Sequence, residues 1–138
     1  MTPILLDSSV IVALLDRREL AHARCLHFMR ELRQPVSTCE AAITESCFLL
    51  SHIAGAAEAL FANVECGDFQ IAFDLGKSAA PVRTLMHKYR DVPMSFADAC
   101  LVQMAEELGT GDILTLDSDF HHYRWRKNKK FNLLIPLG

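Results

Sequence analysis

Acidic residues spread along the whole chain are the side chains of this sequence best suited to chemistry. They are Asp7, Glu45, Asp98 and Asp117, with Asp119 two positions after the last of them. Carboxylates that gather in one cleft repel one another unless a cation lies among them. Their hard oxygen atoms suit Mg²⁺ or Mn²⁺, which activate water and stabilise the leaving oxygen of a phosphodiester. These residues form one site only if the fold brings them together.

Short apolar runs alternate with helical patterns along the chain. The patterns predict strands at 3–7, 35–38, 69–73, 113–116 and 132–135. They predict helices after Asp7 and at 19–33, 38–51, 55–66, 75–90 (interrupted near Pro81) and 95–108. Alternation of this kind implies a mainly parallel sheet with helices on both faces. We therefore expect an α/β protein, a three-layer α/β/α sandwich, with residues 1–138 as a single domain.

The predicted sheet places most of the acidic residues at one edge. Asp7 ends the first strand and Asp117 follows the fourth, so both lie at the carboxyl edge, where open α/β sheets bind ligands. Asp98 lies in the first turn of a helix that begins at the same edge. Glu45 lies about 10 Å from the start of its helix, so its position near this edge is the least certain of the set from geometry alone. Taken alone, it is typical of a solvated helix residue.

Several of these carboxylates also have an ordinary structural role open to them. Asp7 could cap the helix that follows it, and Asp117 or Asp119 could cap a short helix nearby. The spacing Ser95-x-x-Asp98 is close to a capping box, in which the helix dipole favours the carboxylate. Their joint placement on one edge of one sheet favours a functional site over these separate roles. Thr38 and Ser95 are the residues expected to cap two of the helices, and Gly109 is expected to end the second.

Cysteine content and the N-terminal sequence indicate where the protein works. The five cysteines form no CxxC pair, and their number is odd. Both features are typical of reduced residues in a cytoplasmic protein. The first residues contain no positively charged region followed by a long apolar run, so we expect no signal peptide. No stretch of about 18 apolar residues occurs, so we expect no membrane span.

The acidic residues lie in segments that resemble the PIN-domain family, in the family's order and over nearly the whole chain. Residues 5–10 (LLDSSV), followed by 14–16 (LLD), are similar to its opening, and His22-Ala23 lies where it often carries these residues. Thr44-Glu45 resembles the family's second acidic site. Residues 95–99 (SFADA) resemble its third, and residues 115–120 (TLDSDF) resemble its fourth. The compact length of the chain and the sequence at its end resemble the VapC branch of the family, the toxins of bacterial toxin–antitoxin pairs.

The resemblance implies a metal-dependent endoribonuclease that needs Mg²⁺ or Mn²⁺ and cuts an RNA substrate. It also implies a homodimer that an antitoxin protein inhibits. The matching motifs give the catalytic carboxylates as Asp7, Glu45, Asp98 and Asp117. They give the metal ligands as Asp7, Asp98, Asp117 and Asp119, and the supporting hydroxyls as Ser9 and Thr115. The alternative is a catalytically weak PIN-like module that binds RNA or a protein without cutting it.

A basic segment near the end of the chain is the second candidate functional region. Net charge is −3, so the chain is not a globally basic nucleic-acid binder, yet residues 124–130 carry five positive charges. We predict that this segment binds RNA phosphates and stacks a base on Trp125 or Tyr123, although a solvated loop is the alternative. The predicted RNA-binding residues are Trp125, Arg126, Lys127, Lys129 and Lys130.

The apolar run Phe48-Leu49-Leu50, with Ile53, is more apolar than one core needs. It either packs the core or helps to form a groove for an antitoxin helix.

Other enzyme classes lack their required residues. A phosphatase of the haloacid dehalogenase type needs a second Asp two residues after the first, where Ser9 stands. A response-regulator receiver needs an acidic pair and a later lysine after a strand, and these are missing. The G-x-x-x-x-G-K loop of P-loop nucleotide enzymes is also missing.

Overall fold

The computed structural model describes residues 2–137. The strands of its main sheet are β1 (Leu5–Leu6), β2 (Val36–Thr38), β3 (Phe69–Ile71), β4 (Asp112–Leu114) and β7 (Asn132–Leu133). They lie in the order β3-β2-β1-β4-β7, and every neighbouring pair is parallel. The expected parallel sheet is therefore confirmed.

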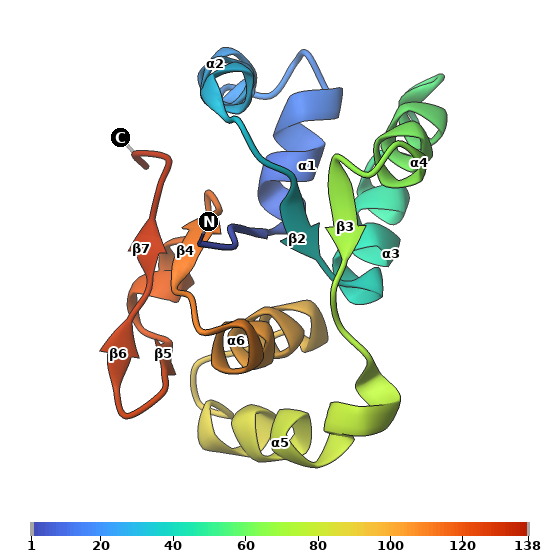
Figure 1. Cartoon of the computed structure of the whole chain (residues 1–138). Coiled ribbons are helices and arrows are strands. Elements are labelled where there is room, and N and C mark those ends of the chain that lie inside the picture. Colours follow the sequence, from blue (N-terminus) through green and yellow to red (C-terminus); the bar gives the residue numbers. More distant parts are fainter. Residues whose placement is uncertain (1, 138) are drawn as a thin grey trace.

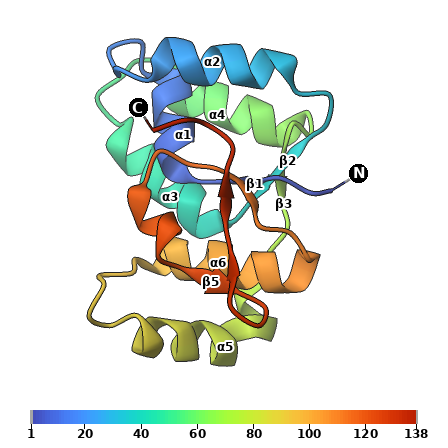
Figure 2. The same ribbon diagram turned by 90° about the vertical axis from the view of Figure 1, so that its left-hand side faces the viewer.

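Helices cover both faces of this sheet. They are α1 (Ser8–Leu15), α2 (His22–Glu31), α3 (Glu40–Leu49), α4 (Ala56–Glu65), α5 (Leu75–Lys88), α6 (Phe96–Leu108) and the 3₁₀ helix η1 (Ser118–His121). Figures 1 and 2 show α1 and α2 on one side of the sheet and α5 and α6 on the other, which confirms the α/β/α sandwich. Within residues 2–137, no helix combines the length and the apolar character needed to cross a bilayer.

Two cores fill the spaces between the sheet and its helices. Successive residues of a strand point to opposite faces, so Leu5 and Leu6, both fully buried, enter different cores. Leu6 packs with residues of α1 and α4, including Ile11 and Leu60, whereas Leu5 packs with residues of α6. The apolar sequence of β1 thus reflects a central strand that is covered on both faces.

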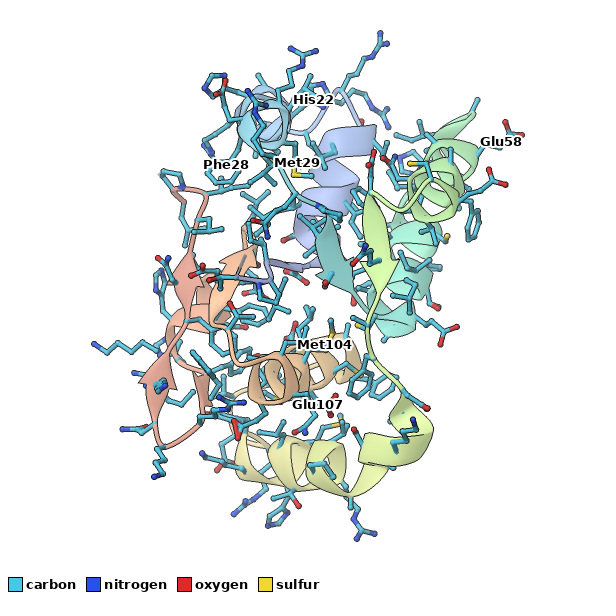
Figure 3. The ribbon with its side chains drawn as sticks, viewed as in Figure 1. His22, Phe28, Met29, Glu58, Met104 and Glu107 are labelled. Carbon is cyan, nitrogen blue, oxygen red and sulfur yellow. The ribbon has the colours of Figure 1, made fainter. Side chains whose placement is uncertain are left out.

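Helix α6, in which eight of thirteen residues are buried, determines where Asp98 lies. Ser95 caps its start, and Gly109, with φ of 69°, ends it, as the sequence predicted. Figure 3 shows Met104 on the side of α6 that faces the sheet and Glu107 on the side that faces α5. The Glu107 carboxylate accepts a hydrogen bond from Ser78 Oγ, which joins α6 to α5.

Some predicted boundaries differ from the structure for local reasons. The expectation that Thr38 caps α3 was wrong, because Thr38 belongs to β2 and its hydroxyl donates to the Leu6 carbonyl at 2.8 Å. Cys39 takes the capping position without a side-chain hydrogen bond. In α5 the helical conformation breaks at Ser78, so Pro81 lies in the first turn of the following piece, where no N–H is needed.

The basic segment, which none of the predicted strands includes, forms an antiparallel hairpin of β5 (Arg124–Trp125) and β6 (Lys129–Lys130). Its turn places three non-glycine residues at positive φ. Trp125 donates its indole N–H to the Lys130 carbonyl at 3.1 Å and packs against Gly111. A Cβ atom at Gly111 would lie only 2.3 Å from the indole nitrogen, so the glycine permits this close packing.

Candidate active site

Asp7 lies where β1 ends and α1 begins. Its backbone N–H donates to the Leu114 carbonyl at 3.0 Å, which extends the pairing of β1 with β4 by one residue. Its Oδ1 accepts the backbone N–H of Ser8 at 2.8 Å and so caps α1. The side chain is only 3% exposed. The capping role that the sequence left open is therefore present, and it fixes the carboxylate at the carboxyl edge of the sheet.

Two hydroxyl groups bind the second oxygen of Asp7. Ser9 Oγ and Thr115 Oγ1 donate to Oδ2 at 2.9 and 2.6 Å. Each hydroxyl also accepts a backbone N–H from the segment after β4, Ser9 from Leu116 and Thr115 from Asp117. Both expected supporting hydroxyls thus connect Asp7 to the chain that carries Asp117.

Burial raises the pKa of Asp7 from its ordinary value of 3.8 to about 6. The hydrogen bonds from Thr115 and Ser9 lower the pKa, whereas the negative charges of Asp98 and Asp117 raise it further. The surroundings of the Asp7 carboxylate therefore contain too little positive charge to stabilise its ionised form. A cation in the site would supply that charge and favour the ionised form.

The remaining predicted carboxylates are each held by a different segment. Glu45 on α3 accepts a hydrogen bond from Ser8 Oγ at 3.0 Å and so lies next to Asp7. Asp98 forms a capping box with Ser95, and burial raises its pKa above the usual range. Asp117 caps η1 through a 2.9 Å hydrogen bond from the Asp119 N–H.

A cleft of about 520 Å³ brings the five predicted acidic residues together. Its acidic lining consists of Asp7, Glu19, Glu45, Asp98, Asp117 and Asp119. None of the described residues that line it is Lys, Arg or His. Hydrolysis of a phosphodiester by activated water is the chemistry that such a lining supports when it holds a divalent cation.

The donor set fits a hard divalent cation, because it consists of carboxylate and hydroxyl oxygens without sulfur or imidazole. No three Asp, Glu, His or Cys side chains in residues 2–137 are close enough together to hold an ion as they stand. Binding would therefore require carboxylates to turn inward.

Sequence reasoning missed three residues of this site. Tyr123, considered for base stacking, is fully buried and donates its hydroxyl to Asp98 Oδ2 at 3.0 Å. Ser8, which joins Asp7 to Glu45, could have been found from its place beside Asp7. Glu19 lies in the turn between α1 and α2 and lines the cleft, and no motif marks it.

The predicted RNA-binding hairpin lies outside the cleft. It packs near the C-terminal end of α6, where Arg126 Nε donates to the Glu106 carbonyl at 3.0 Å. Glu106 follows Asp98 by about two helical turns, or about 12 Å along α6. Within the hairpin, Lys129 Nζ lies 4.9 Å from the centre of the Trp125 ring. Trp125 thus uses its N–H and one ring face in contacts with the hairpin itself.

Comparisons with known proteins agree with the fold. The sequence profile of the PIN domain family matches residues 4–126. The crystal structure of VapC20 from Mycobacterium tuberculosis, a toxin that cleaves the sarcin–ricin loop, superposes with a TM-score of 0.76. Its sequence identity is 19%, and the alignment covers 84% of this chain and 91% of that chain, which shows a shared fold. No curated protein sequence gives a significant match.

Asp7→Asn is expected to remove a pH-dependent loss of stability from the metal-free protein. Because the folded-state pKa of about 6 lies above the ordinary 3.8, folding binds a proton, and stability falls as the pH rises from about 4 to about 6. Asparagine does not titrate, so it removes this fall of the order of 3 kcal/mol, while the hydrogen-bond acceptor that it lacks lowers stability equally at every pH. Urea unfolding in EDTA across this range measures the effect. Asp91→Asn on an exposed loop is the charge-matched control. A fall as large as that of the wild type in Asp7→Asn would show that Asp7 does not cause it.

Tyr123→Phe tests the hydrogen bond that holds Asp98. It is expected to lower the free energy of unfolding by about 1–3 kcal/mol, because a buried carboxylate loses its donor. In an Asp98→Asn background, Tyr123→Phe is expected to lower the free energy of unfolding by less. The difference between the two losses, which is the coupling energy of the two residues, is expected to exceed about 0.5 kcal/mol. Tyr89→Phe, which removes the hydroxyl bonded to the Arg124 N–H, serves as the control. Equal losses for Tyr123→Phe in both backgrounds would refute the role of this bond.

Proposed function

Since the chain belongs to the PIN domain family, we propose that it is a metal-dependent endoribonuclease with its active site in the acidic cleft. The observation that carries this proposal is the gathering of six carboxylates around one cleft with no basic side chain among the described lining residues. These carboxylates come from five separate segments of the chain. Residues 1–138 are proposed to act as one nuclease domain.

The metal is proposed to be Mg²⁺ or Mn²⁺, held by Asp7, Asp98 and Asp117, with Asp119 as the further ligand. When bound, the ion would neutralise charge on the carboxylates and the scissile phosphate and make water a better nucleophile. Zinc suits the site less well, because the cleft presents oxygen donors without Cys or His among its described lining residues.

The chain's own residues position these groups. Ser9 and Thr115 hold one oxygen of Asp7, while the Ser8 N–H holds the other. Ser8 Oγ also holds Glu45, which is placed beside Asp7 to take a proton from the attacking water. Water attacks phosphorus and the bond to the 3′ oxygen breaks. That oxygen takes a proton from solvent, so a 5′-phosphate and a 3′-hydroxyl remain. No protein nucleophile takes part.

We further propose that the nuclease is the toxin of a toxin–antitoxin pair and that an antitoxin protein inhibits it. The apolar run on α3 supports it. Leu50 and Ile53 pack in the core, whereas Phe48 is 78% and Leu49 44% exposed. Leu49 also lines the cleft, so an antitoxin segment that covered these side chains would also cover the carboxylates. A cytoplasmic homodimer is the form proposed for the active protein.

Cleavage of total cellular RNA by the purified, partner-free protein tests the function. With Mg²⁺ or Mn²⁺ we expect discrete fragments with 5′-phosphate ends, and with EDTA none. Asp98→Asn is expected to slow cleavage by about 100-fold or more, because it removes one of the charges that hold the ion. Asp91→Asn makes the same chemical change outside the cleft and is expected to cut at the wild-type rate.

Two results would count against the proposal. The first is cleavage by Asp98→Asn at the wild-type rate. The second is failure of the folded, metal-supplied protein to cut any class of RNA. Tight, metal-independent RNA binding without cleavage would assign the chain to the alternative, a catalytically weak binding module.

A further inference from the structure

A second charged groove, of about 340 Å³, lies between α5, α6 and the β5–β6 hairpin. Four positively charged side chains line it: Lys88 from α5, Arg124 from β5, and Arg126 and Lys127 from the hairpin turn. Glu106 is the acidic residue of its described lining, and the Glu106 carboxylate accepts the backbone N–H of Arg126. Positive charge therefore predominates in this groove, in contrast to the cleft.

No positively charged side chain of the groove forms an ion pair in the described part of the chain, and Glu106 offsets one of the four charges. Within residues 2–137 the single ion pair is that of Arg18 with Asp16, on another part of the molecule. Arg124 donates to the carbonyls of His121 and Tyr123 at 2.7 and 2.9 Å. Carbonyl partners fix the orientation of a guanidinium without removing its charge. The groove thus presents positioned cations to a ligand.

The lysine side chains extend this positive surface. Lys88 and Lys127 are exposed at the rim of the groove, and Lys129 and Lys130 are exposed on the second strand of the hairpin. The whole chain carries a net charge of −3, so this region stands out from an otherwise acidic protein. A localised positive surface of this kind attracts a polyanion.

We propose that the groove binds backbone phosphates of an RNA segment that lies outside the bond being cut. This inference rests on the proposed function, which brings RNA to the acidic cleft. Glu106 lies about 12 Å along α6 from Asp98, so a phosphate in the groove is not the one at the carboxylates. An RNA must extend beyond the cleft to reach both. The groove therefore increases the affinity for longer RNA through its positive charge, and it does not distinguish one base sequence from another.

Binding of a labelled, unstructured oligouridylate of roughly 20 nucleotides, measured in EDTA at several salt concentrations, tests the proposal. Lys88→Gln and Lys127→Gln are each expected to weaken binding at low salt. Each is also expected to reduce the slope of log affinity against log salt by about 0.7, the value for one phosphate contact on a single strand. Lys77→Gln is the matched control, because Lys77 is exposed on the same helix but outside the groove. Its affinity and slope are expected to equal those of the wild type.

Unchanged slopes for both groove variants would overturn the proposal, as would an equal loss for Lys77→Gln. A glutamate-rich peptide that bound through Lys88 and Lys127, while RNA binding did not depend on them, would assign the groove to an acidic protein instead and also overturn it. EDTA prevents metal-dependent cleavage, so this test does not depend on catalysis. Groove-dependent binding by a protein that cuts no RNA would defeat the proposed function alone.

Discussion

The burial of the Asp7 carboxylate is the constraint on which the site depends. A buried charge is costly unless hydrogen-bond donors or an opposite charge surround it. Asp7 receives its donors from Ser8 and Ser9 at the start of α1 and from Thr115 after β4. These donors meet because β1 and β4 are neighbouring parallel strands whose carboxyl ends lie side by side. The pairing that forms the centre of the sheet therefore also assembles the site.

Helix α6 arranges the two charged regions of the protein. Its N-terminal end carries Asp98, and its C-terminal end receives the guanidinium of Arg126 through the Glu106 carbonyl. Negative charge at the first turn and positive charge at the last turn both agree with the helix dipole. Since α6 is buried against the sheet, the acidic cleft and the basic groove are held at a fixed separation. An RNA longer than a few nucleotides would span the distance between the cleft and the groove.

The parts of this structure that were predictable are those encoded locally. Apolar periodicity gave the strand and helix order, and Ser95 and Gly109 marked the ends of α6 because cap residues act within one turn. Since parallel strands end at a common edge, the same order indicated that Asp7 and Asp117 would lie together. Tyr123 could not be assigned, because it reaches Asp98 only after packing edge-on against Phe120 and Tyr89. The hairpin escaped prediction for the same reason, since the packing of its Trp125 depends on a distant part of the chain.

In the proposed mechanism, the carboxylates of the cleft share a divalent cation. Crystals grown with Mn²⁺, in a form that leaves the cleft open to solvent, would test it through the anomalous scattering of the ion. We expect an anomalous peak among Asp7, Asp98 and Asp117, with their side chains turned inward compared with the metal-free protein. A well-ordered cleft without a peak at saturating Mn²⁺, or a peak bound only elsewhere on the protein, would contradict it.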